Sequence, residues 1–175
     1  ISLNMNRSLP TLLIVGLGLL GASLGMALRG GSYRRLGWAR RPNIRRWAVG
    51  CDVVDETDDD LGRLIAQADL TVFALPVPQI IEFLNSHAEA WRPGAVVTDM
   101  GSVKSAVMAA GRRLAERGVH FVGGHPMAGT EKSGPESAFP ELYSNADVFV
   151  CPAADSPESA VEAVEALWRT VGART

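Results

Sequence analysis

Short apolar runs alternate with longer amphipathic stretches along most of the chain. Apolar runs that stop at a glycine, a proline or a polar residue predict buried strands, here at 11–15, 35–39, 69–74, 95–98, 119–122 and 147–151. Apolar residues at helical spacing predict helices at 19–29, from 42 to about 47, 78–91, from 103 to about 117, and 156–171. This alternation indicates an α/β fold, a doubly wound and mostly parallel sheet with helices on both faces.

Size and composition fit a single globular domain. The chain has 175 residues, of which 47% are hydrophobic and 21% charged, and its net charge is −2. Residues 1–9 precede the first predicted strand and begin with Ile1 rather than methionine, so we interpret them as a disordered leader or a vector remnant. Residues 10–175 then form the folded domain.

The same composition excludes several kinds of partner. No apolar run approaches the roughly 20 residues that span a bilayer, and Cys51 and Cys151 lack the CxxC spacing of a metal site. We therefore expect a cytoplasmic protein with no metal and no membrane contact. Seven arginines between positions 29 and 46 leave nucleic-acid binding as a minor alternative, which predicts salt-sensitive binding. Since few aromatic residues are interleaved with these arginines, we expect no nucleic-acid partner.

A glycine motif joins the first predicted strand to the first predicted helix. The stretch "VGLGLLGASLG" holds Gly16-x-Gly18-x-x-Gly21. In this context the motif is typical of a dinucleotide site, because the glycines permit a tight turn, a close pyrophosphate and close helix packing. The helix N-terminus offers free N–H groups to the phosphates. We predict a Rossmann-like NAD(P)-binding domain whose turn residues contact the cofactor: Gly16, Leu17, Gly18, Leu19, Leu20 and Gly21.

The residues after the second predicted strand favour NADP over NAD. An NAD site usually has an acidic residue about 20 positions after the motif, where it binds the ribose 2′-hydroxyl. Here Ala39 is followed by Arg40 and Arg41, and a guanidinium can bind a 2′-phosphate. In a rival alignment "AVGCD" is the second strand and Asp52 the ribose ligand. We favour the first alignment and expect NADP, with NAD possible.

His125 is the best candidate for a catalytic group among the three histidines. It lies in "VGGHPMAGTEKSG", which leaves a predicted strand at the carboxyl end, where α/β folds bind their ligands. Oxidation of an alcohol by a nicotinamide requires a proton acceptor, and a neutral imidazole suits that task. We assign structural roles to His120, within a strand, and to His87, late in a helix.

Three stretches, "VGLGLLGASLG", "VTDMGSVKSAV" and "FVGGHPMAGTEKSG", resemble the prephenate/arogenate dehydrogenase family. The similarity extends from about Leu12 to Val171 in order and spacing, and it is most specific in "GGHPMAGTEKSG". The resemblance implies NAD(P)-dependent oxidative decarboxylation in tyrosine biosynthesis. Prephenate would give 4-hydroxyphenylpyruvate, and arogenate would give tyrosine. The residues leave the choice between these substrates open.

The resemblance also implies roles for particular residues. His125 resembles the catalytic histidine that polarises or deprotonates the ring C4 hydroxyl. Ser102 resembles the serine that binds this hydroxyl and the histidine near the nicotinamide. Thr130 and Glu131 resemble active-site residues at the substrate entrance, with Glu131 counted among the catalytic groups. The cofactor would also lie along Leu75, Pro76 and Val77.

Plainer interpretations accompany several of these roles. Ser102 follows Gly101 at the predicted start of a helix, where a serine commonly acts as the N-cap. Glu131 could be an acid in a solvated loop. Lys104 and Lys132 could attract a dianionic substrate, although a surface position is the default for lysine.

Two expectations concern the rest of the family pattern. Members resemble one another in having a helical C-terminal domain, which dimerises and holds the substrate carboxylates, and nothing in this sequence corresponds to it. We therefore expect a homodimer only in a full-length form, and weak turnover by residues 1–175 alone. The alternatives are another NADP-dependent oxidoreductase of similar fold, such as a hydroxyacid dehydrogenase or imine reductase, or a non-catalytic NADP-binding module.

Overall fold

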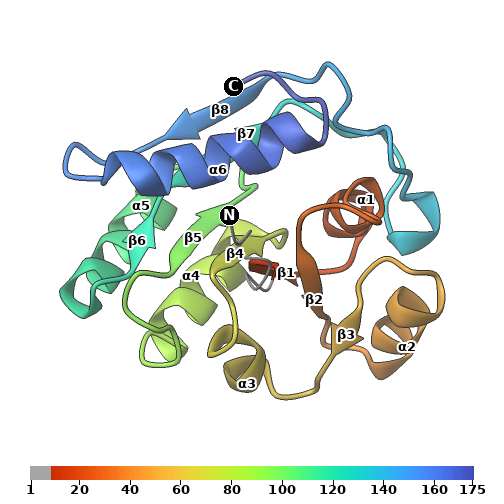
Figure 1. Cartoon of the computed structure of the whole chain (residues 1–175), viewed down its shortest axis with the longest axis horizontal. Coiled ribbons are helices and arrows are strands. Elements are labelled where there is room, and N and C mark those ends of the chain that lie inside the picture. The colour runs from red at the N-terminus through yellow and green to blue at the C-terminus, as the bar shows by residue number, and fades with distance from the viewer. Residues whose placement is uncertain (1–8) are drawn as a thin grey trace, which may run out of the picture.

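The computed structural model describes residues 9–175 and contains a six-stranded parallel sheet (Figure 1). The strands lie in the order β3-β2-β1-β4-β5-β6. Their bounds are β1 Thr11–Val15, β2 Arg34–Trp38, β3 Glu56–Thr57, β4 Leu70–Phe73, β5 Val96–Asp99 and β6 His120–Phe121. Since the order reverses between β1 and β4, the carboxyl ends of these two strands border the crevice where such folds bind ligands. The predicted α/β class is confirmed.

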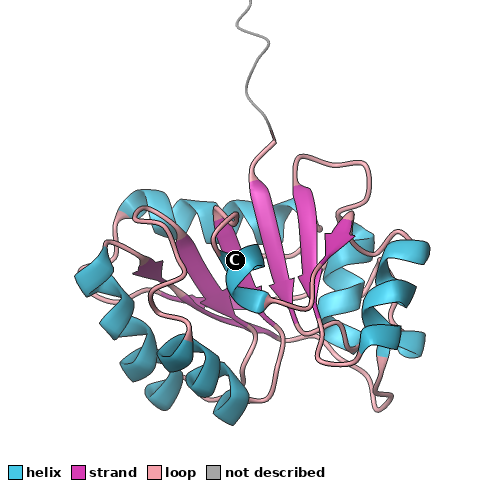
Figure 2. Ribbon diagram, turned by 90° about the horizontal axis from the view of Figure 1, so that it is seen from below, coloured by secondary structure: helices cyan, strands magenta, loops and turns pink. Residues whose placement is uncertain are grey.

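Helices cover both faces of this sheet (Figure 2). Strand β1 is buried on both sides, with Leu12 and Ile14 in one core cluster and Leu13 and Val15 in the other. This division follows from the alternation of side chains along a strand. Helices α1 Leu19–Ala27, α2 Pro42–Gly50 and α6 Glu158–Thr170 pack on the first face; α3 Leu61–Ile65, α4 Val77–Ser86 and α5 Ser105–Arg112 pack on the second.

The stretch around His125 is a strand, and the prediction of a loop there was wrong. Strand β7 (Gly123–Pro126) pairs antiparallel with β8 (Val148–Cys151) in a separate two-stranded sheet. The predicted strand at 147–151 therefore exists but lies outside the parallel sheet. Glycine and proline concealed β7, because its pairing depends on a partner far along the chain rather than on its own propensity.

Other differences lie at element ends and in one acidic region. Strand β3 and helix α3 were not predicted, and several predicted helices end early. The predicted helix from 103 divides into α5 and a 3₁₀ segment, η1 (Arg113–Arg117), and a second 3₁₀ segment, η2, spans Pro135–Ser137. Apart from Leu9, the predicted leader at 1–9 lies outside the described residues. Within residues 9–175, no helix has the length and apolar character needed to cross a membrane.

Several arginines of the basic run pair with the acidic residues that follow it. Arg35 of β2 is 3% exposed, and its guanidinium lies 2.7 Å from both Asp52 and Asp55. It also donates to the carbonyl of Gly25 at 3.0 Å. Asp52 follows helix α2 and lies near the amino end of β2, away from the crevice, so the rival alignment that made it the ribose ligand is wrong.

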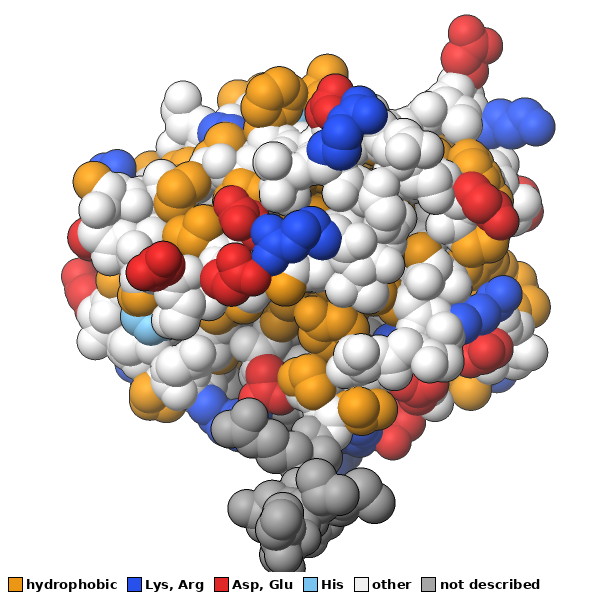
Figure 3. All heavy atoms as spheres, turned by 45° about the horizontal axis from the view of Figure 1, so that its top comes forward, with side chains coloured by type: hydrophobic (Ala, Val, Ile, Leu, Met, Phe, Trp, Pro, Cys, Tyr) orange, Lys and Arg blue, Asp and Glu red, His pale blue; other side chains and the backbone are white. Residues whose placement is uncertain are grey.

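Opposite charges also lie together on the outer surface near α6 (Figure 3). On α6, Arg169 pairs with Glu162 and Glu165. Beyond the end of α6, Arg174 pairs with Asp147 at 2.7 Å. These pairs are solvent-exposed, so each contributes little to stability.

Candidate active site

The three glycines of the turn between β1 and α1 have different surroundings. Gly16 has a φ of +102°, and a side chain there would overlap the carbonyl oxygen of Ala74 and lie 2.8 Å from Leu75 Cδ2. A side chain on Gly21 would overlap the carbonyl oxygen of Gly16. A Cβ on Gly18 would meet nothing within 4 Å, so this position is open to a ligand. The surroundings match the tight-turn, open-approach and close-packing roles of the motif.

The first turn of α1 presents free backbone N–H groups at this open position. Gly18 is the N-cap and has no side chain to accept from them, and no acidic residue lies in the first turn. This arrangement favours an anion such as a pyrophosphate. Tyr143 stabilises the start of α1, because its buried hydroxyl donates to the carbonyl of Leu20 at 2.8 Å. Burial raises the pKa of Tyr143 well above its ordinary value, so the hydroxyl stays neutral and able to donate.

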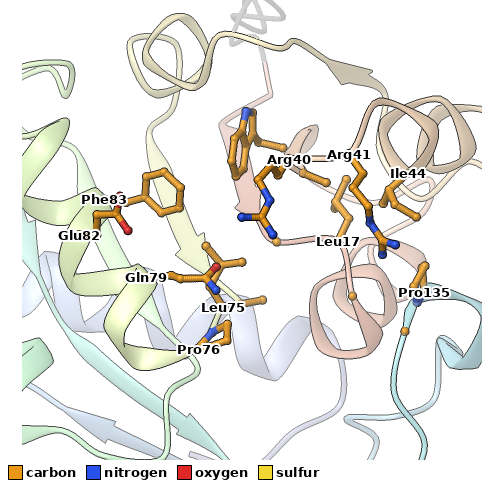
Figure 4. Close-up of a pocket in the computed structure, with 16 residues that line it drawn as sticks. Leu17, Arg40, Arg41, Ile44, Leu75, Pro76, Gln79, Glu82, Phe83 and Pro135 are labelled. Carbon is orange, nitrogen blue, oxygen red and sulfur yellow. The ribbon is translucent and has the colours of Figure 1, made fainter.

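A cavity of about 430 Å³ lies beside the turn (Figure 4). Arg40 and Arg41 border one side, and Gln79, Glu82 and Phe83 of α4 border the other. Neither arginine forms an ion pair with another described residue. The cavity is also lined by Gly16, Leu17, Gly18, Trp38, Ala39, Ile44, Ala74, Leu75, Pro76, Gly134 and Pro135.

Sequence analysis missed two aromatic residues that line this cavity. Trp38 and Phe83 meet edge to face with their ring centroids 5.3 Å apart, so they give the cavity an apolar side. Both belong to elements that were predicted: Trp38 ends β2 at the carboxyl edge of the sheet, and Phe83 lies in the second half of α4. The place of Trp38 at the end of a predicted strand could have indicated its role. The sequence does not show which side of α4 faces the cavity, so Phe83 could not be identified without the fold.

A second hollow of about 340 Å³ adjoins the first and shares Gly18, Ala74, Leu75, Pro76 and Gly134 with it. It is further lined by Leu19, Leu20, Met100, Lys132 and Ser133. The two hollows thus lie on either side of the glycine turn, as the two halves of a dinucleotide require. Val77, also predicted at the cofactor, begins α4 but lines neither hollow.

His125 lies in the middle of β7, half-buried, opposite Phe149 of β8. The preceding residue, Gly124, contacts the carboxyl end of β5, because its N–H donates to Asp99 Oδ1 at 3.2 Å. His125 itself lines neither hollow, but the segment that it begins continues to Lys132, Ser133 and Gly134, which do. The structure therefore brings this segment, rather than the imidazole itself, against the glycine turn.

The other predicted substrate residues are exposed. Ser102 lies in the connection between β5 and α5. Helix α5 begins at Ser105 and its N-cap is Lys104, so the N-cap role for Ser102 was wrong. Thr130 accepts from the backbone N–H of Lys132 at 3.1 Å, and Glu131 is exposed in the same loop.

Lys104 is not the surface lysine that its residue type suggested. Its side chain is 19% exposed and forms an ion pair with Asp99, whose side chain is fully buried. Two charges at the carboxyl end of β5 therefore belong to the neighbourhood of His125 and were not foreseen. No local pattern indicates the pair, because Asp99 ends one element and Lys104 caps another.

Comparison with known proteins agrees with this geometry. Residues 26–175 match the family described as "Prephenate dehydrogenase, nucleotide-binding domain". The chain is 30% identical to a prephenate dehydrogenase of Bacillus subtilis over 97% of this chain and 46% of that protein, so it spans about half the length of that relative.

Two solved structures are similar over nearly the whole chain. They are an arogenate dehydrogenase of Synechocystis, with 30% identity and a TM-score of 0.87, and a prephenate dehydrogenase of A. aeolicus in complex with hydroxyphenyl propionate and NAD+, with 31% identity and a TM-score of 0.86. The match covers 94% and 96% of this chain, and 58% and 59% of those chains, respectively. The glycine turn, the paired hollows and these matches together place the chain in the prephenate dehydrogenase family, as its nucleotide-binding domain.

Proposed function

We propose that the protein is a prephenate or arogenate dehydrogenase that uses NADP. One observation carries the proposal: the segment that starts at His125 also borders the second hollow through Lys132–Gly134. A single stretch thus links the proposed proton acceptor to the proposed nicotinamide site. The names of the relatives and the family match support the same reaction.

The reaction needs little from the protein beyond alignment and one proton acceptor. The bound nicotinamide supplies the acceptor for the hydride from ring C4. His125 takes the proton of the C4 hydroxyl, and it returns that proton to the phenolate oxygen after CO2 has left and the ring has become aromatic. Ser102 holds the hydroxyl near His125, while Thr130 and Glu131 line the substrate entrance. Their exposed positions suit contact with a substrate.

We test this function in the full-length gene product, with both substrates and both cofactors. Replacing His125 with Asn is expected to lower kcat by about 10²–10⁴-fold, the usual contribution of a general base. His120→Asn serves as the matched control, since His120 lies on strand β6 and lines neither hollow at the turn. If neither prephenate nor arogenate is oxidised, or if His125→Asn retains full activity, the proposed function is wrong.

The NADP preference depends on the arginines at the end of β2. Arg40 and Arg41 are exposed, face the larger cavity and are available to a 2′-phosphate. We expect NADP to bind at least about tenfold more tightly than NAD, a difference of roughly 1.4 kcal/mol. Arg40→Asp should reverse the ratio, because a carboxylate repels the phosphate and binds a ribose hydroxyl.

The control for this experiment is Arg46→Asp, an equal change of charge on α2 at a residue that does not line the cavity. Dissociation constants for both cofactors are measured by fluorescence titration. Tighter binding of NAD by the unaltered protein, or an equal effect of both substitutions, contradicts the assignment.

A further inference from the structure

The carboxylate of Asp99 occupies an unusual position for a charge, at the carboxyl end of β5 with no exposed surface. It accepts from the backbone N–H groups of Gly101 at 2.9 Å and Gly124 at 3.2 Å, and it pairs with Lys104. A buried ion pair is weak evidence for stability, because desolvation offsets most of its attraction. The role of Asp99 and Lys104 therefore lies in the backbone groups to which they are hydrogen-bonded.

Asp99 and Lys104 form hydrogen bonds with both backbone polar groups of Gly124. Asp99 accepts from its N–H, and Lys104 Nζ donates to its carbonyl at 2.6 Å. Gly124 also has no room for a side chain, since a Cβ would lie 3.1 Å from Thr98 Oγ1 and closer still to the carbonyl oxygen of Asp99. The residue directly before His125 is thus fixed on the end of β5.

No strand ladder performs this task among the described residues. Strand β5 pairs with β4 and β6, whereas β7 pairs only with β8. The nearest backbone hydrogen bond to the parallel sheet precedes β7, where the N–H of Val122 donates to the carbonyl of Val97 at 2.9 Å. Without Asp99 and Lys104, the residues of β7 beyond that point would be joined to the sheet by packing and by chain connectivity. Such contacts leave strand position less sharply defined than directed hydrogen bonds do.

We propose that Asp99 and Lys104 are positioning residues that hold His125 at the carboxyl edge of the parallel sheet. This inference rests on the proposed function, in which His125 accepts the proton. A shift of about 1 Å in a reacting group can lower the rate about 10²-fold. The pair therefore acts on catalysis through the placement of β7, with no contact to the substrate required.

The test uses Asp99→Asn together with Lys104→Met, which removes both charges and leaves no unpaired ion in the interior. The matched control is Glu162→Gln with Arg169→Met, an exposed pair on α6. The first readout is the Hε1 chemical shift of each histidine in the NMR spectrum of the chain, with no ligand added. We expect the His125 signal to move in the Asp99/Lys104 variant while those of His87 and His120 stay, and all three to stay in the control.

The second readout is the kinetics of the full-length gene product. We expect kcat to fall by roughly 10–100-fold with the KM for NADP within about twofold of its original value. An unmoved His125 signal, or movement of all three signals together, overturns the inference, even if His125→Asn abolishes turnover. A displaced His125 signal with unchanged kcat upholds the positioning but contradicts the catalytic role of His125.

Discussion

An added methyl group would meet different surroundings at each glycine of the turn between β1 and α1. At Gly21 it would overlap the backbone of Gly16, whereas at Gly18 it would enter open space. Gly18 also has ordinary backbone angles, with φ −83° and ψ −159°, so an alanine fits there without strain. These two positions therefore separate the needs of the ligand from those of the fold.

Gly18→Ala should mainly weaken cofactor binding, whereas Gly21→Ala should mainly lower stability. We expect Gly18→Ala to change the free energy of unfolding by less than about 1 kcal/mol and to weaken cofactor binding at least about tenfold, because the methyl group occupies the pyrophosphate position. We expect Gly21→Ala to cost about 2 kcal/mol or more through overpacking. Urea unfolding and cofactor titration measure the two effects, and normal cofactor affinity in Gly18→Ala contradicts the proposed site.

Tyr143 is the buried support of the same turn. Replacing it with Phe keeps the ring but removes the hydrogen bond to the carbonyl of Leu20, so we expect a loss of about 1 kcal/mol in the free energy of unfolding. Tyr33→Phe is the control, since Tyr33 is half-buried and lies in the connection between α1 and β2. Equal urea midpoints for Tyr143→Phe and the unaltered chain would show that the hydrogen bond contributes nothing.

For single residues, the sequence predicts the structural role correctly where that role depends on immediate neighbours in the chain. The turn that contains Gly16, Gly18 and Gly21 lies between β1 and α1, where it was predicted, because turn geometry and helix start are local properties. The burial of Lys104 was missed because its partners, Asp99 and the carbonyl of Gly124, come together only when β7 crosses the end of β5.

Among the elements, those with a strong apolar signal were predicted and those held by distant pairing were not. Strand β1 and helix α6 lie close to their predicted positions, since each has a regular pattern of buried residues. Strand β3 has only two residues and is defined by its pairing with β2, from which helix α2 separates it in the sequence. Helix α3 comes after an acidic run. Strand β7 contains two glycines and a proline, which favour a loop in any local prediction.

The link between β2 and the segment before β3 predicts a response to acid. Burial acts to raise the pKa of Asp55, but hydrogen bonds and charge from Arg35 outweigh it, so the pKa lies below its ordinary value of 3.8. A depressed pKa in the folded state gives stability that is present above 3.8 and is lost as the pH falls through the folded value.

We therefore expect the urea midpoint to fall between about pH 5 and pH 2, and Asp55→Asn to flatten part of this decline. Glu141→Gln is the control, because that exposed acid forms no ion pair with another described residue. Since the Asp55 side chain is 40% exposed, solvent screening limits the effect. Parallel acid profiles for Asp55→Asn and the unaltered chain would contradict the assigned linkage.

As a whole, the molecule has the glycine turn, both hollows and the His125 segment in one folded unit, yet it spans only about half of its relatives. We expect the 175-residue chain to bind NADP but to oxidise prephenate at a small fraction of the rate of the full-length gene product. Sedimentation should show a dimer for that product. Turnover by the chain at ordinary enzyme rates, about 1–10³ s⁻¹, would overturn this expectation.

Helix α6 covers the same face of the sheet as α1, and Val164, Leu167 and Trp168 on it are fully buried. During synthesis the ribosome releases α6 after every strand of the parallel sheet. Until it emerges, the apolar surface beneath it stays in contact with water or with chaperones, which makes the nascent protein prone to aggregate. Productive folding of the earlier segments therefore depends on a helix that contributes no group to either hollow beside the glycine turn.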